Sequence, residues 1–208
     1  MMPGGSREAY AAIEGIVSKV AAQVDDGPCV TFIGAGGAGN FVKMIHNGIE
    51  YGDMQLISEA YDILRTLGGL TNAELAAVFG AWNKAELSSF LVEITAIILG
   101  KKDDKDPSGK GYLVDKIVDQ TGAKGTGKWT VQQAAELLVA APTIAASLDG
   151  RYMSALKPER TAAAAHYEKL KVGQPKAVPG IDKAQLIEDV RRCAFLGGRF
   201  RVQGGLRV

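Results

Sequence analysis

Apolar residues recur every three or four positions through most of this chain, a spacing typical of helices that bury one face. In residues 7–25 the pattern places five side chains on one face that we expect to be buried: Ile13, Ile16, Val17, Val20 and Ala21. The longest helical pattern runs from Phe41 to about Leu67, and Asn72 is the expected N-cap of the next helix. Six further segments have helical patterns: 85–98, 113–120, 131–140, 144–156, 159–171 and 182–195.

One short segment has the pattern of a strand. Residues 29–34 (CVTFIG) follow the helix-breaking sequence DDGP and form a β-type apolar run that ends at a glycine. Because this run stands beside about nine helical segments, the expected fold is mainly α, with a small α/β part at its start.

Composition and charge argue against several classes of partner. The net charge is +1, which gives no electrostatic basis for binding nucleic acid or an anionic membrane. The most apolar stretch, residues 87–99, is interrupted by Glu93 and is too short to span a bilayer. The start of the chain shows no signal-peptide pattern. Cys29 and Cys193 form no CxxC pair, so we expect no metal site and two reduced thiols in a protein of the cytoplasm or a plastid.

A glycine-rich loop follows the expected strand and precedes the longest helix. Residues 34–39 (GAGGAG) match the dinucleotide-binding pattern G-x-G-x-x-G in the correct local context. A site that used Gly34, Gly36 and Gly39 would also need a second strand, ending in an acidic residue about 20 positions later. Residues 41–67 keep a helical pattern instead. We therefore favour a tight turn between domains over a cofactor-binding loop.

Four polar residues fall at i, i+3, i+4 and i+7 of this helix and so share one face: Lys43, His46, Asn47 and Glu50. The flanking faces are apolar, and Gly48 and Gly52 permit close packing by another backbone. A buried stripe of amine, imidazole, amide and carboxylate suits acid–base chemistry, because burial and proximity shift their proton affinities. A solvated polar face is the alternative interpretation.

The same region carries a long family signature. Residues 36–61 (GGAGNFVKMIHNGIEYGDMQLISEAY) resemble the signature of 6-phosphogluconate dehydrogenases. Two later segments, WNKAELSSFLVEIT and KGTGKWT, resemble family segments in the same order and at suitable spacing. The first ten residues resemble the stretch that closes the family's nucleotide-binding domain. Asn40 departs from the pattern, because family members have histidine there.

The resemblance covers residues 1–192 and implies three parts. These are the end of a nucleotide-binding domain with a connecting strand and loop (1–40), a truncated helical catalytic domain (41–192) and an atypical tail (193–208). Four glycines in the tail are expected to break any helix: Gly197, Gly198, Gly204 and Gly205. Family members also have an N-terminal Rossmann domain and a C-terminal arm that reaches the partner subunit. Neither pattern occurs here, so the chain is expected to be a fragment.

The resemblance implies that the whole enzyme is a homodimer that uses NADP to decarboxylate 6-phosphogluconate oxidatively, giving ribulose 5-phosphate and CO2 in the pentose phosphate pathway. Lys43 matches the general base that removes the hydroxyl proton, and Glu50 matches the acid that protonates the enediol after CO2 leaves. His46 and Asn47 match residues that hold the substrate's hydroxyl and carboxylate groups. Tyr51 matches a phosphate contact.

Two cations match phosphate ligands of the family, Lys124 in KGTGKWT and Arg151 in GRYMSALKPER. Gly125 and Gly127 would let the backbone approach the ligand, and the planar guanidinium suits a bidentate contact. Lys128 is a competitor that spacing alone does not exclude. Without the resemblance, these cations would be interpreted as ordinary surface charges.

Three functions remain open from the sequence. The first is a piece of the dehydrogenase, expected to be inactive alone because the residues that would hold NADP belong to a domain not recognised here. The second is a non-enzymatic helical fragment that dimerises or binds sugar phosphate. The third is a dinucleotide-binding module built on the glycine loop. We favour the first for the family and the second for the isolated chain.

Overall fold

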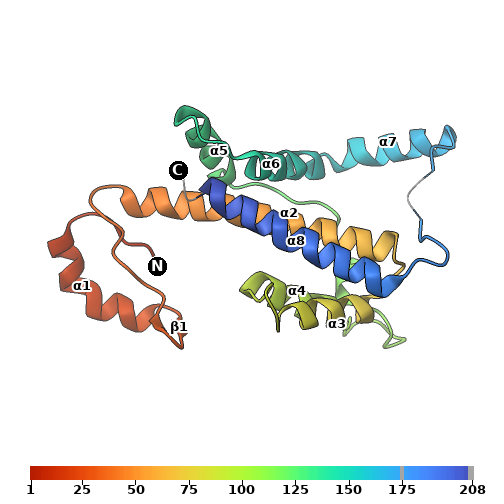
Figure 1. Ribbon diagram of the computed structural model, residues 1–208, viewed down its shortest axis with the longest axis horizontal. Coiled ribbons are helices and arrows are strands. Elements are labelled where there is room, and N and C mark those ends of the chain that lie inside the picture. Colours follow the sequence, from red (N-terminus) through yellow and green to blue (C-terminus); the bar gives the residue numbers. More distant parts are fainter. Residues whose placement is uncertain (174–175, 206–208) are drawn as a thin grey trace.

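The computed structural model describes residues 1–173 and 176–205 and is mainly helical, as predicted (Figure 1). The described residues form eight α-helices, whose bounds are α1 Arg7–Val20, α2 Ala38–Thr66, α3 Asn72–Trp82, α4 Phe90–Gly100, α5 Thr126–Glu136, α6 Pro142–Ala155, α7 Lys157–Lys169 and α8 Lys183–Gly205. A short 3-10 helix, η1, spans Leu113–Lys116, and two strands, β1 Gln23–Val24 and β2 Gly27–Pro28, form an antiparallel hairpin.

The predicted strand at residues 29–34 is wrong. Its backbone hydrogen bonds go to separate segments: the Cys29 amide donates to the Ala22 carbonyl at 2.7 Å, the Ile33 amide donates to the Pro3 carbonyl at 2.8 Å, and the Gly5 amide donates to the Gly34 carbonyl at 3.0 Å. Gly4 and Gly34 form an isolated parallel bridge. A β-ladder needs a partner that runs alongside for several residues. The apolar run is therefore extended without becoming a strand.

Helix α2 is the axis of the described fold. In Figure 1 it runs beside α8 along much of its length, and it also packs against α3, α4, α5 and α6. Its C-terminal half buries Ala60 and Leu64 in the main apolar core. The other buried members of this core come from the segment before α3, from α3, α4 and α8: Leu70, Leu75, Phe79, Trp82, Val92, Leu99 and Val190. The core thus fixes α3 and α4 along one side of α2.

Helix α5 packs closely on the N-terminal half of α2 through glycine. A Cβ atom at Gly48 would lie 2.5 Å from Cγ2 of Thr130, which is closer than real Cβ contacts allow. The buried Thr130 hydroxyl lies 2.9 Å from the carbonyl oxygens of Met44 and Thr126, to which it can donate its hydrogen bond within the interface. The expected role of Gly48 in close packing is confirmed.

The start of α3 differs from the prediction by one residue. Thr71, not Asn72, is the N-cap: its hydroxyl accepts from the Glu74 amide at 3.3 Å, and the Glu74 carboxylate accepts from the Thr71 amide at 2.7 Å. Asn72 is buried instead, where it accepts from Arg65 at 2.6 Å and donates to Asp115 at 2.8 Å. Both residue types are good N-caps, and the tertiary contacts of Asn72 decide between them.

Two other expected helices are shorter than predicted. The helix expected from residue 85 begins at Phe90, because Ser89 caps it by accepting from the Val92 amide at 3.3 Å. The helix expected over 113–120 is reduced to η1.

The glycines expected to end the last helix do not break it. Helix α8 continues through Gly197 and Gly198 to Gly205, and residues 206–208 of the expected tail lie outside the described residues. A Cβ at Gly197 would lie 2.8 Å from Cδ2 of Leu56 on α2. Glycine costs a helix about 1 kcal/mol relative to alanine, but here it permits α8 to approach α2. Packing therefore outweighs intrinsic propensity.

The apolar face of α1 is also not as expected. Ala21, just after the helix, is buried, but Ile13, Ile16 and Val20 are 46%, 65% and 64% exposed. Periodicity identified the helix correctly, but it does not show whether another segment covers the face.

Within the described ranges, no helix is long and apolar enough to cross a membrane. Those same residues contain no group of three or more His, Cys, Asp or Glu side chains arranged to hold a metal ion.

Candidate functional site

The polar stripe lies on the first half of α2, as predicted. Lys43, His46, Asn47 and Glu50 fall within three turns of this unbroken helix and project from one side by its periodicity. His46 and Glu50 line a cleft of about 260 Å³, together with Asp53 and the start of α4. Lys43 and Asn47 are not among its lining residues, so two of the four stripe residues face this cleft.

The expected burial of the stripe is wrong. Lys43 and His46 are exposed, whereas Asn47 and Glu50 are half-buried. The buried side of this half of α2 is the one that carries Ile45, Gly48 and Tyr51, where α5 packs. The stripe faces away from α5, and the start of α4 borders it at His46 and Glu50.

Beside the stripe, Tyr51 of α2 contacts two residues that are distant from it in sequence, Lys124 and Arg151. Tyr51 is buried, with 7% of its surface exposed. Its hydroxyl oxygen accepts a long hydrogen bond of 3.5 Å from the backbone amide of Lys124. The guanidinium carbon of Arg151 lies 4.3 Å from the centre of the Tyr51 ring, in the geometry of a cation–π contact. We call these three residues the Tyr51 cluster.

Two glycines shape the start of α5, next to Lys124. Gly125 has a φ of +105°, which lies in the left-handed region that glycine favours, and it starts α5. A Cβ at Gly127 would lie 2.5 Å from Cε2 of Tyr51. Gly127 thus makes room for the Tyr51 ring. The backbone amide of Lys124, and not its ammonium, makes the contact with Tyr51, so Lys128 stays a competitor for the cation of this site.

A second cleft, of about 580 Å³, opens at the Tyr51 cluster. It is lined by residues of α2 and α4, by the segment 118–121 and by α6, which contributes Arg151. Leu91 of α4 lines both this cleft and the one at Glu50. The acid–base stripe and the Tyr51 cluster therefore face adjoining clefts along α2.

The second cleft is lined by one cation, Arg151, and by one carboxylate, Asp119, which is paired with Lys157 and Arg160. Arg151 donates through Nε to the Gly122 carbonyl at 3.1 Å. Within the described residues, its two terminal nitrogens have no hydrogen-bond partner. The Lys124 ammonium has none either, but Lys124 is not among the residues that line this cleft. A guanidinium with a free pair of donors is suited to bidentate contact with a phosphate. The arrangement can hold a ligand with a phosphate at one end and polar groups near Glu50 at the other.

Sequence reasoning did not assign Ser89, Phe90 and Leu91, which form the wall opposite Glu50. They belong to the segment WNKAELSSFLVEIT, which resembled a family segment. That resemblance was the available signal, because nothing in the chemistry of these three side chains suggests a site.

The glycine loop does not form a dinucleotide site in the described structure. A Cβ at Gly39 would collide with the Met2 carbonyl and would lie 2.7 Å from the Gly4 amide, so the chain's own N-terminal residues occupy this face. Helix α2 continues unbroken to Thr66, and the predicted absence of a second strand there is confirmed. The described sheet is a two-residue hairpin, and a dinucleotide crevice requires parallel strands. These residues do not fit NADP.

Comparison with known proteins agrees with this geometry. Residues 39–203 match the family model described as 6-phosphogluconate dehydrogenase, C-terminal domain. The chain is 64% identical over 195 residues to a Spinacia oleracea protein named 6-phosphogluconate dehydrogenase, decarboxylating 1, covering 94% of this chain and 40% of the relative. A chloroplastic form from Arabidopsis thaliana is 64% identical over 197 residues, covering 94% of this chain and again 40% of the relative.

A solved Plasmodium falciparum structure has a TM-score of 0.79 and 44% identity, covering 97% of this chain and 44% of that one. That protein is described as a 6-phosphogluconate dehydrogenase in its apo form, in complex with its cofactor NADP+ and in complex with its substrate 6-phosphogluconate. The present chain spans about 40% of the length of the curated relatives named above.

Proposed function

Because this chain belongs to the 6-phosphogluconate dehydrogenase family, we propose that α2, the loop before α5, and α6 form the substrate side of an active site for the oxidative decarboxylation of 6-phosphogluconate. The products of that reaction are ribulose 5-phosphate and CO2, and NADP is the proposed hydride acceptor. The observation that carries the proposal is the Tyr51 cluster beside the Lys43–Glu50 stripe.

The phosphate end of the substrate is assigned to the Tyr51 cluster. The Tyr51 oxygen accepts from the Lys124 amide, so its own proton can be donated to a phosphate oxygen. The terminal nitrogens of Arg151 and the ammonium of Lys124 supply positive charge from two other elements. Several donors around one phosphate, in a cleft partly shielded from water, favour the dianion strongly.

The sugar acid end is assigned to the stripe. Lys43 and Glu50 are seven residues apart, a rise of about 10 Å along the helix. Their side chains can lean toward each other, so that both reach one bound ligand. In this assignment Lys43 takes the hydroxyl proton as hydride passes to NADP, and Glu50 supplies the proton to the enediol that remains after CO2 leaves. Between them, His46 and Asn47 hold the hydroxyl and carboxylate groups.

For the 208-residue chain by itself, we propose sugar-phosphate binding without oxidation. The described residues form no dinucleotide crevice, and hydride transfer needs the nicotinamide held close to the sugar carbon. This is the non-enzymatic alternative raised by the sequence, and the observation that favours it is the occupation of the glycine loop by residues 2–4.

We also propose that the working form is a homodimer of the cytosol or a plastid. Several large apolar side chains are exposed to solvent in the single chain, among them Phe90, which is 72% exposed, and Leu138, which is 94% exposed. Exposed apolar surface of this kind is typical of a protein that associates with another copy or with a partner.

The proposed plastid location is supported by relatives whose names place them in chloroplasts.

Calorimetric titration tests the proposal. We expect the purified chain to bind 6-phosphogluconate saturably, and to bind NADP not at all. Arg151→Ala should weaken the binding of 6-phosphogluconate by at least about tenfold, because a charge-assisted contact is worth about 1.5–3 kcal/mol. Arg192→Ala, which removes an exposed arginine of α8, is the matched control and should bind normally.

Two results would contradict the proposal. If 6-phosphogluconate does not bind, the substrate site is misassigned. If NADPH forms above the level of a Lys43→Ala control, the chain holds a cofactor site that the described structure does not explain.

A further inference from the structure

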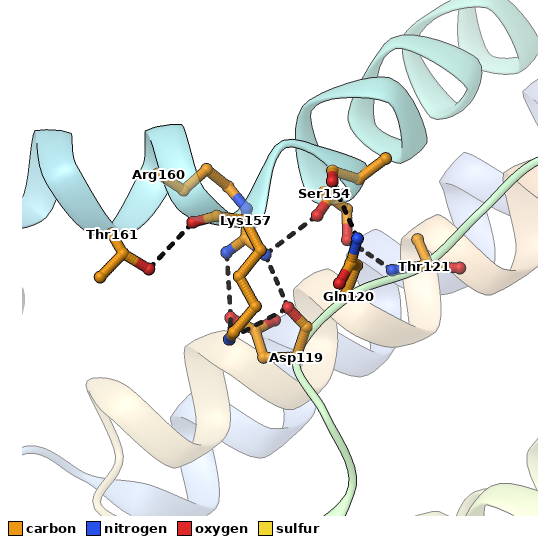
Figure 2. Close-up of polar contacts among 8 residues, drawn as sticks. Asp119, Gln120, Thr121, Ser154, Lys157, Arg160 and Thr161 are labelled. Carbon is orange, nitrogen blue, oxygen red and sulfur yellow. Dashed lines mark hydrogen bonds and ion pairs between the residues drawn. The ribbon is translucent and has the colours of Figure 1, made fainter.

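The segment just before Lys124 is held against the junction of α6 and α7 by a set of polar contacts (Figure 2). Arg160, in the first turn of α7, makes three of them. Its Nη1 donates to the Asp119 carboxylate at 2.9 Å, and its Nη2 donates to the Asp119 carbonyl at 2.6 Å and to the Ser154 carbonyl at 3.0 Å. One guanidinium thus joins the loop to the last turn of α6.

The residues after Asp119 continue this attachment one by one. The Gln120 side chain donates to the Ala155 carbonyl at 3.0 Å, and the Thr121 amide donates to the Ser154 hydroxyl at 3.0 Å. The Gly122 carbonyl accepts from Arg151, the arginine of the Tyr51 cluster. Four consecutive loop residues, 119–122, are therefore bonded to α6 or α7, and Figure 2 shows the first three of them.

This attachment bears on the site because Lys124 lies two residues further along. Nine residues, 117–125, connect η1 to α5 without regular secondary structure. Such a segment loses much conformational entropy when it is fixed, so it stays in place only where contacts hold it. The Lys124 amide has a single long hydrogen bond to Tyr51. The contacts at 119–122 are shorter and more numerous.

We propose that Arg160 is a positioning residue: it fixes the segment 119–122 so that Lys124 is held beside Tyr51 before the sugar phosphate arrives. This inference rests on the proposed function and adds to it a residue that does not touch the ligand. Arginine suits the role because its planar fork reaches acceptors on two different elements at once, which a lysine cannot do.

The charges around Asp119 agree with this role. The hydrogen bond from Arg160 is the largest cause of a lowered pKa at Asp119, so the pair is charged at neutral pH. Lys157 also lies 3.6 Å from the Asp119 carboxylate. The Nε of Arg160 is buried and has no partner among the described residues. The hydrogen bonds of Arg160 are thus made by its two terminal nitrogens, to Asp119 and to Ser154.

The test compares Arg160→Ala, Arg160→Lys and the control Lys169→Ala, which removes an exposed cation from the same helix. Two quantities are measured on the 208-residue chain: amide hydrogen exchange in the peptide covering 117–125, and the affinity for 6-phosphogluconate by calorimetry. We expect Arg160→Ala to raise exchange in 117–125 by about tenfold or more, to leave α3 unchanged, and to weaken binding about tenfold. Arg160→Lys should recover part of both, and Lys169→Ala should change neither.

The outcomes separate this inference from the proposed function. If the unmodified chain does not bind 6-phosphogluconate, the proposed function fails, and the role of Arg160 in binding fails with it. If the unmodified chain binds and Arg160→Ala binds equally well, the inference alone is overturned. If Arg160→Ala does not fold, Asp119→Asn is measured instead, because it weakens the same contact from the loop side. Faster exchange confined to 117–125 with weaker binding would then support the inference, and unchanged values would overturn it.

Discussion

Replacing Gly127 by alanine should damage the site more than it damages the fold. The new Cβ would lie 2.5 Å from Cε2, 2.6 Å from Cδ2 and 3.2 Å from Cζ of Tyr51. Favourable carbon contacts lie at about 3.5–4.0 Å, so the ring or α5 must move by about 1 Å. The ring is buried and stacked on Arg151, so it cannot move without disturbing both partners of the Tyr51 cluster.

The expected stability change is small because two effects oppose each other. Overpacking a buried contact costs about 1–3 kcal/mol, whereas alanine in place of glycine stabilises a helix by about 0.5–1 kcal/mol. A net loss of about 1 kcal/mol lowers the Tm of a chain of this size by about 2–4 °C. Binding should suffer more, because displacing Tyr51 misaligns charge-assisted contacts worth about 1.5–3 kcal/mol each. We expect the affinity for 6-phosphogluconate to fall by at least about tenfold.

Calorimetry and thermal unfolding of the same preparations check this prediction. Gly15→Ala is the matched control, because a Cβ at Gly15 in α1 meets nothing within 4 Å. It should leave binding unchanged and raise the Tm slightly. If Gly127→Ala binds as tightly as the unmodified chain, the close packing of Tyr51 on α5 is not what positions the site.

Three further predictions concern single contacts. Tyr51→Phe keeps the stacking on Arg151 but removes the hydroxyl, so affinity for 6-phosphogluconate should fall about tenfold with little change in Tm; equal affinity would exclude a phosphate contact at this oxygen. Thr71→Ala removes the N-cap of α3 and should lower the free energy of unfolding by about 1 kcal/mol in a denaturant titration; no loss would argue against the observed capping box. Hydrogen bonds from Ser108 and Gly111 lower the pKa of Asp106 to about 2, so its contribution to stability is present above about pH 4 and is lost as the pH falls through 2. Asp106→Asn should therefore lower the Tm at pH 7, and the difference should shrink between about pH 4 and pH 2; a constant difference would contradict the assignment.

Much of the helical architecture was predictable because each helix carries its own periodic signal. Helix α2 starts three residues before the predicted Phe41 and ends at Thr66, one residue before the predicted end. The errors lie where a second segment decides the outcome. The apolar run at 29–34 lacks a partner strand. Asn72 hydrogen-bonds to Arg65 and Asp115 and does not cap the helix. Gly197 stays helical because it packs against Leu56.

The candidate site was predictable only through the family resemblance. Spacing placed the four stripe residues on one face, but it could not show that Lys43 would be exposed, since exposure depends on what covers the helix. No sequence pattern links Tyr51 to Arg151, which lie 100 positions apart. The contacts of Arg160 could not be predicted from the sequence either, because charged residues in a polar helix normally lie on a solvated surface.

A crystal structure of this chain grown with 6-phosphogluconate would test the central claim most directly. We predict phosphate oxygens within hydrogen-bonding distance of the Tyr51 hydroxyl, the Lys124 ammonium and the Arg151 guanidinium, with the carboxylate end of the ligand directed along α2 toward Glu50. A phosphate bound away from these three residues, or a ligand whose sugar acid end points away from the Lys43–Glu50 stripe, would contradict the account.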